Sequence, residues 1–482
     1  MYAECNYHTH GCSRVLVEGL LPYMWEALVP MLRSVGWPTS HRVTVSALIA
    51  LTAQLVSVSA ANAVPAFAIQ TGQPCTACHI GGFGPHLTPF GRQFKLEGYT
   101  ARGGDPFTVP ISAMAVASYV HTAENQPSPP APNYATNDNA TLDQASIFVA
   151  GGMGDHVGGL AQFTYDGVGR AVSWDNLDIR AVTKTTISGN DVLLGVSLNN
   201  NPGVEDVWNT FPAWGFPYSS SDLSPAPAAS TIFDGALAQY VLGVNAYVYW
   251  NSAIYAEVGV SSTPSRGFLR AMGVDPYGSG PVLSGAAPYV RVAYEKDYGE
   301  NNFEVGSFGF FPNLQPSGMS GTPDRYSDVG LDASYQFIGD GDNTYTINAI
   351  YTHEAQDLAG SLPMGAATNV HDSLNEFRFD GSYYWRNRIG VTVQPFWTLG
   401  SSDSLLYAGN RTFSPDTEGV MFQIDGTPFG TDPSFLGPRF NVRVGIQYTA
   451  YTRFDGAKYN YDGMGRNASD NNTFRLFTWF AF

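Results

Sequence analysis

The feature that most restricts the fold is a strict alternation of apolar and polar side chains that recurs from residue 112 to the C-terminus. Residues 328–337, 376–385 and 440–449 each keep this two-residue period. A helix places residues three and four apart on one face, so it cannot sustain the pattern. Segments of about ten alternating residues are typical of outer-membrane strands, with apolar side chains toward lipid and polar ones toward a lumen.

The alternation predicts an all-β fold, an antiparallel outer-membrane barrel of about sixteen strands over residues 111–482. A barrel of this size encloses a channel rather than a core filled by side chains. Strands are expected to begin near Ser112, Gln144, Val157, Trp174, Val192, Gly235, Ala253, Pro288, Asn302, Ser327, Thr344, Asn375, Ile389, Gly419, Phe440 and Asn472.

The connections between these strands alternate in length. The even ones are mostly short and carry Gly, Asn or Asp, whereas 200–234, 262–287 and 354–374 are long. Short periplasmic turns and long outer loops are the rule for outer-membrane barrels. The connection over 427–438 departs from this rule, and the alternative fold is a soluble sandwich. The aromatic last strand, which ends at Phe482, favours the barrel.

Composition agrees with a membrane barrel and excludes one class of partner. Only 13% of the residues are charged, another 13% are aromatic, and the formal net charge is −17. This balance argues against nucleic-acid binding. It would suit attraction of a metal cation, or it only keeps the protein soluble.

Residues 1–63 are expected to be an N-terminal extension and a cleaved export signal. Arg33, His41 and Arg42 precede an apolar run, and Ala61-Asn62-Ala63 provides a small-residue cleavage site, which is the order of a secretory signal. Met31 is an alternative start, which would make residues 1–30 a gene-start error. No transmembrane helix is expected after Val64.

Cys75-Thr76-Ala77-Cys78-His79 follows the signal. Two cysteines three apart with a His directly after the second are the spacing for covalent attachment of one haem c. Cys75 and Cys78 would form the thioethers, and His79 would be the proximal iron ligand. The alternatives are a redox dithiol, half of a zinc site, or a disulfide.

Residues 64–110 are expected to form a small haem-binding segment that plugs the channel or its periplasmic mouth. Thr88 as N-cap, Pro89 at the first position and Gly98 past the end predict a helix. Phe90 and Phe94 would share one of its faces, either to cover a haem or simply to pack the helix.

The chain resembles the fused outer-membrane monohaem cytochrome c–porins of iron-oxidising bacteria from about Val64 to its end. The pieces that carry the resemblance are Ala66–Ala68, Thr71-Gly72, Cys75–His79, Pro85–Arg92, Asn200–Pro202, Asp206–Asn209, Pro212–Pro217 and Tyr459–Tyr461 continuing to Asn472. The resemblance implies a haem that takes electrons from extracellular Fe(II). It also implies a periplasmic acceptor, either a small cytochrome or a blue-copper protein.

Further residues are candidates for a role at the haem. His86 or Met114 would be the sixth iron ligand, with Met114 favoured because a Met ligand raises the reduction potential; Met153 and His121 are further alternatives. Arg92 and Lys95 would pair with the propionates or be solvated helix charges. Glu205 and Asp206, expected in an outer loop, would gather hard cations.

The sequence therefore predicts an electron-transfer protein of the outer membrane, which as an enzyme would be an oxidoreductase acting on Fe(II). Two alternatives stay open. One is electron uptake from a donor other than iron, and the other is a diffusion porin in which the haem segment is a structural plug.

Overall fold

The computed structural model describes residues 66–103, 110–211, 218–318, 321–339, 341–430, 434 and 440–482. All of them belong to one compact unit, Ala63–Phe482. The predicted N-terminal extension and export signal, residues 1–63, lie outside the described residues. None of the described helices is long and apolar enough to cross a membrane.

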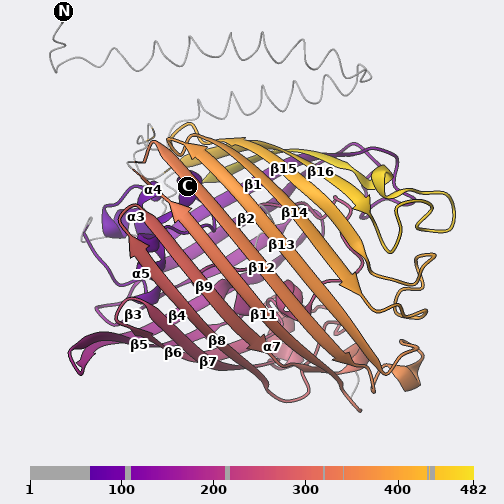
Figure 1. Ribbon diagram of the computed structural model, residues 1–482, viewed down its shortest axis with the longest axis horizontal. Helices are drawn as coiled ribbons and strands as arrows, with labels where there is room; N and C mark the ends of the chain where they lie inside the picture. The colour runs from indigo at the N-terminus through magenta and orange to yellow at the C-terminus, as the bar shows by residue number, and fades with distance from the viewer. Residues whose placement is uncertain are drawn as a thin grey trace, which may run out of the picture. The chain divides into compact units, whose positions relative to one another are not determined.

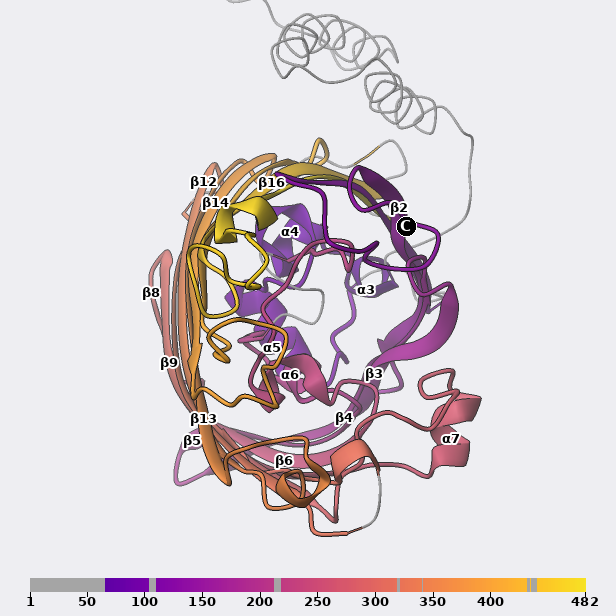
Figure 2. The same ribbon diagram turned by 90° about the vertical axis from the view of Figure 1, so that its right-hand side faces the viewer.

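Within the described residues, sixteen strands form one closed antiparallel ring, because β1 pairs with both β2 and β17 (Figures 1 and 2). A further two-residue strand, β10 (Asn313–Leu314), pairs with β11. The ring consists of β1 (Ile111–Thr122), β2 (Asn139–Gly152), β3 (Val157–Asp166), β4 (Ala171–Ile187), β5 (Asn190–Asn199), β6 (Leu242–Trp250), β7 (Ile254–Ser262), β8 (Ala287–Tyr298), β9 (Asn301–Phe310), β11 (Asp324–Phe337), β12 (Asn343–Asp357), β13 (His371–Trp385), β14 (Ile389–Gly400), β15 (Thr417–Gly426), β16 (Asn441–Arg453) and β17 (Thr473–Ala481).

The two faces of the strands have opposite character, as the alternation predicts. In β16, Val444, Ile446 and Tyr448 are 41–43% exposed on the outside, whereas Arg443 and Gln447 are buried on the inside. Around the rest of the ring, most of the exposed large hydrophobic residues likewise belong to the strands. An apolar outer surface with a polar interior is the arrangement that a lipid environment requires.

Two strand predictions have different outcomes. The strand expected near Gly419 is confirmed as β15. The strand expected near Gly235 is wrong at its start, because β6 begins only at Leu242. Residues Ile232–Ala236 form instead an irregular helical turn, η2. That turn is fixed inside the barrel, where the Ile232 and Phe233 backbone N–H groups donate to Glu354 and Asp328 at 2.6 and 2.7 Å.

Residues 66–103, called here the lumen segment, lie inside the ring at the end that holds the C-terminus (Figures 1 and 2). The segment contains α3 (Ala66–Thr71), α4 (Cys75–Cys78), η1 (Ile80–Gly82) and α5 (Pro89–Leu96). The caps predicted for the last helix are confirmed: Thr88 Oγ1 accepts from the Gly91 N–H at 3.1 Å, Pro89 is the first residue, and Gly98 has a φ of +68°.

The connection between β5 and β6, residues 200–241, also enters the barrel and is called here the inner loop. It begins with α6 (Pro202–Glu205), which lies within the ring of strands in Figure 2. The other described helical pieces belong to outer connections: α7 (Arg266–Ala271), η3 (Pro316–Gly318), η4 (Leu362–Met364) and η5 (Ala468–Asn471). The lumen is therefore occupied by both the lumen segment and the inner loop.

Candidate functional site

The Cys-x-x-Cys-His motif forms a single helical turn inside the barrel. Cys75 and Cys78 are free thiols, both partly buried, and stand one turn apart in α4. His79 ends the turn in an extended conformation, with its N–H donating to the Cys75 carbonyl at 2.9 Å. Cys75 packs against an apolar cluster that contains Phe83, Met114 and Trp479.

The environment of the two thiols differs from that of a reactive dithiol. Burial raises the pKa of both, and it raises that of Cys78 to about 12 with a further contribution from Cys75. Redox-active Cys-x-x-Cys pairs need the opposite shift, because the thiolate is the reacting species. Within the described part of the chain, no group of three or more His, Cys, Asp or Glu residues could hold a metal ion. The raised thiol pKa values disfavour the redox-dithiol alternative.

His79 is an enclosed imidazole whose neighbours include the Gly84 backbone and the charge of Arg443. Its Nδ1 atom is inaccessible and finds no hydrogen bond among the described residues. Burial lowers the pKa of His79 to about 4, and the positive charge of Arg443 lowers it further. A hydrogen bond to the Gly84 backbone acts in the opposite direction. The imidazole is therefore neutral near pH 7, which is the form that binds metals. Two cysteines with this neutral imidazole are a donor set that fits a covalently bound haem.

The backbone after the motif returns to it as a closed loop. The Thr88 N–H donates to the Cys78 carbonyl at 3.0 Å, and the Ile80 N–H donates to the His86 carbonyl at 2.9 Å. A Cβ on Gly91 would lie 2.2 Å from the Cys78 carbonyl oxygen. Helix α5 can therefore rest on the motif only because Gly91 has no side chain.

The two predicted propionate partners bind the barrel. Arg92 donates to Glu295 Oε1 at 2.5 and 2.9 Å and to Asn302 at 2.7 Å. Lys95 Nζ donates to the backbone carbonyls of Val204 and Asp206 of the inner loop. Both side chains are buried. They join the lumen segment to its surroundings, and their role toward a propionate stays a prediction.

The four candidates for the sixth ligand occupy different places. Met114 points inward from β1 and is buried in the cluster that also contains Cys75. His86 is buried, and its two ring nitrogens lie 2.8 Å from the Tyr218 hydroxyl and 3.1 Å from Gln336 Nε2. His121 stands at the other end of β1, 2.7 Å from Asp138. Met153 is 65% exposed beyond β2. Met114 is thus the candidate that packs beside the motif, and its role stays a prediction.

Phe90 and Phe94 lie one turn apart in α5, but only Phe94 is buried. Phe94 is buried, with its ring centroid 5.1 Å from that of Phe67 and 5.7 Å from that of Tyr99. Phe90 is 47% exposed. Phe94 therefore packs the lumen segment internally, whereas Phe90 is the aromatic side chain of α5 that stays accessible.

Glu205 and Asp206 lie in the predicted long connection, but this connection folds inward, so that they are not displayed to cations outside the barrel as expected. Both are buried in the lumen, where Glu205 lies 3.2 Å from Arg180 and Asp206 lies 3.4 Å from Arg291. Burial raises the pKa of Glu205, and neighbouring Glu257 raises it further. Burial acts in the same direction on Asp206, but Arg291 turns the net pKa shift downward. These carboxylates anchor the inner loop because their buried partners are arginines of the barrel wall.

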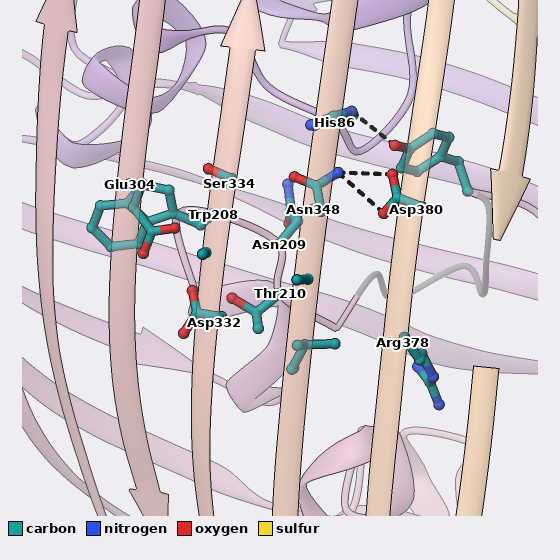
Figure 3. A pocket seen from close by; sticks show the side chains of 14 residues that line it. His86, Trp208, Asn209, Thr210, Glu304, Asp332, Ser334, Asn348, Arg378 and Asp380 are labelled. Atoms are coloured by element: carbon teal, nitrogen blue, oxygen red, sulfur yellow. Dashed lines mark hydrogen bonds between the residues drawn. The ribbon is translucent and has the colours of Figure 1, made fainter. Parts of the chain in front are cut away.

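Between the lumen segment, the inner loop and the wall lies a small polar cavity of about 40 Å³, shown in Figure 3. His86 borders it from the lumen segment, and Asn348 and Asp380 border it from β12 and β13, joined by hydrogen bonds of 2.9 and 3.1 Å. A second cavity, of about 360 Å³, is lined by Asp143, Asp166, Asp175 and Asp222 and reaches Trp479 beside the motif. The lumen therefore keeps hydrophilic space next to the motif.

No protein-family model and no curated protein sequence matches the chain. Among solved structures, a loop-deletion form of OmpT from Vibrio cholerae has a TM-score of 0.42 and 10% identity, covering 77% of this chain and 98% of that one. The DcaP channel of Acinetobacter baumannii has a TM-score of 0.42 and 12% identity, covering 77% and 96%. An anion-selective porin from Comamonas acidovorans has a TM-score of 0.41 and 11% identity, covering 77% and 98%.

The closed ring of strands, the apolar outer surface and the polar lumen are features of the chain itself. Together they make it a porin-like β-barrel protein of the outer membrane, in contact with membrane lipid.

Proposed function

We propose that this barrel carries one haem c on Cys75 and Cys78 and passes electrons from extracellular Fe(II) to a periplasmic cytochrome or blue-copper protein. The position of the Cys-x-x-Cys-His motif inside the barrel supports this proposal. Helix α4 (Cys75–Cys78), which His79 follows directly, lies inside the barrel at the end that holds the C-terminus (Figures 1 and 2). That end is periplasmic in barrels of this kind.

For this electron transfer the protein needs mainly to hold and position the cofactor. A haem bound there would supply a one-electron centre, so that each Fe(II) oxidised to Fe(III) yields one electron for the acceptor. The chain itself supplies a neutral imidazole at His79, apolar cover from Phe83 and Trp479, and a lumen segment fixed to the wall through Arg92. No general acid, base or nucleophile is needed. A different electron donor would use the same features.

A diffusion porin with a structural plug is the second candidate function. It is favoured by the wide sixteen-strand ring and by the cavity of about 360 Å³ with its aspartate lining. The segments inside the lumen, which are fixed there by buried contacts of Arg92, Lys95, Glu205 and Asp206, would be its structural plug. The two functions differ in whether ions or electrons cross.

One pair of proteins separates the two functions. The folded wild-type barrel is expected to give the pyridine-haemochrome spectrum of one haem c per chain, to be reduced by Fe(II), and to show little conductance in planar bilayers. Cys78→Ser is expected to lose the normally attached haem and the response to Fe(II). A wild-type barrel that lacks covalent haem and conducts ions equally well with either residue would establish the porin and overturn the conduit.

A further inference from the structure

Arg443 of β16 joins the barrel wall to the backbone that follows the Cys-x-x-Cys-His motif. Its side chain is fully enclosed, with 1% of the residue exposed. Its Nη2 atom donates to the carbonyl oxygens of Gly81 and Phe83, each at 2.7 Å. These carbonyls lie two and four residues after His79. A strand more than 350 residues away along the chain therefore fixes the loop that carries the proximal His.

Other groups of the wall complete this contact. The Gly81 N–H donates to Asn387 Oδ1 at 2.8 Å, and the Gly81 carbonyl accepts from Thr427 Oγ1 at 3.0 Å. Gly81 has a φ of +71°, and a Cβ on it would lie 2.6 Å from a ring carbon of Tyr384. The loop is therefore positioned by the barrel on several sides, and Arg443 is its charged contact.

The Arg443 guanidinium has one carboxylate and two aromatic rings beside it. Asp425 Oδ2 lies 3.4 Å from its Nε atom. Its guanidinium carbon also lies 5.2 Å from the ring centroid of Phe83 and 5.9 Å from that of Trp479. Arginine stays protonated at every accessible pH, and a charge enclosed away from water acts more strongly than an exposed one.

We propose that Arg443 positions the loop of Cys75–His79 and that its charge raises the reduction potential of a haem attached there. This inference rests on the proposed function. Adding one electron to a haem lowers its positive charge by one, so a fixed cation beside it favours the reduced form. Asp425 opposes that effect. A raised potential is what a haem needs in order to accept an electron from Fe(II).

The test uses the folded holoprotein and two substitutions of opposite sign. Arg443→Gln is expected to shift the midpoint potential downward, whereas Asp425→Asn is expected to shift it upward. Arg443→Lys keeps the charge but has one nitrogen in place of the Nη2 atom that donates to Gly81 and Phe83 and the Nε atom that faces Asp425. It is expected to keep most of the potential while changing the haem absorption or resonance spectrum. Arg378→Gln serves as the control, because Arg378 pairs with Asp234 and Glu376 rather than with the lumen segment.

Spectroelectrochemical titration measures the midpoint potential of each variant, and the haem content of each is measured alongside. Potentials that do not move, or that move in the same direction for Arg443→Gln and Asp425→Asn, would overturn the inference while leaving the haem in place. If Arg443→Gln fails to assemble, Asp425→Asn and Arg443→Lys still decide the sign and the positioning role. A wild-type barrel without covalent haem would instead overturn the proposed function on which the inference rests.

Discussion

Single atoms decide how closely the motif can approach the rest of the lumen segment. Gly91 lies within helix α5, where glycine costs about 1 kcal/mol relative to alanine. Close packing against α4 explains why glycine stands at this position, because a Cβ would lie 2.2 Å from the Cys78 carbonyl oxygen. That oxygen also accepts the Thr88 N–H at 3.0 Å. The spacing between α4 and α5 thus depends on one missing methyl group.

Replacing Gly91 with Ala is expected to destabilise the lumen segment by about 1–3 kcal/mol, the usual cost of overpacking, and to lower the haem content. Gly381→Ala is the matched control, because nothing lies within 4 Å of the Cβ it would add in β13. Haem per folded barrel and the thermal unfolding midpoint of both variants measure the effect. Equal values for the two variants would contradict the close contact.

His86 gives the lumen segment a pH dependence of known sign. Burial lowers the pKa of His86 to about 3, with the charges of Arg92 and Arg443 contributing. An unfolded His has a pKa near 6.5, so between these values the unfolded chain binds more protons. Stability is therefore complete above about pH 6.5 and is lost progressively as the pH falls toward about 3.

His86→Gln removes this titration while keeping a side chain that can bond Tyr218 and Gln336. The unfolding midpoint of the variant is expected to fall less steeply than that of the wild type between about pH 6.5 and pH 3. Parallel curves for the two proteins would show that His86 is not held neutral in the folded barrel.

At the scale of the element, the lumen segment depends on the barrel for its structure. Fewer than forty described residues cannot bury a sufficient core of their own. The wall supplies what is missing through polar contacts at Arg92 and at Tyr99, which donates to Asp178 at 2.6 Å, and the inner loop adds a contact at Lys95. Segment and wall are thus expected to unfold as one cooperative unit.

The ion pair between Arg92 and Glu295 tests this dependence. Arg92→Met leaves Glu295 buried without its cation, which is expected to cost about 3–5 kcal/mol. The double variant with Glu295→Gln should recover part of that loss. Lys184→Met is the control, since Lys184 pairs with Glu97 at 2.7 Å but is 64% exposed, and exposed pairs contribute about 1 kcal/mol or less. Denaturant midpoints in detergent that are equal for Arg92→Met and Lys184→Met would refute the role of the buried pair.

For the whole molecule, the strand ring follows from local alternation, because each strand has one face toward lipid and one toward the lumen. Helix α5 of the lumen segment likewise follows from local signals, the Thr88 cap and Pro89 at its first position. The inner loop does not, and it displaced the expected strand start at Gly235. Its course depends on Arg180 and Arg291, which the sequence places on strands far from Glu205 and Asp206. Ion pairs between residues far apart in the chain cannot be predicted from the pattern of neighbouring residues.

Electron transfer across a sealed membrane is the direct test of an electron conduit through this barrel. The barrel would be placed in closed lipid vesicles that enclose ferric cytochrome c, which is too large to leave through the lumen, and Fe(II) would be added outside. We expect the enclosed cytochrome to be reduced with the wild-type barrel and not with Cys78→Ser. An enclosed cytochrome that stays oxidised beside a haem-loaded barrel, or that is reduced equally well with Cys78→Ser, would contradict this expectation.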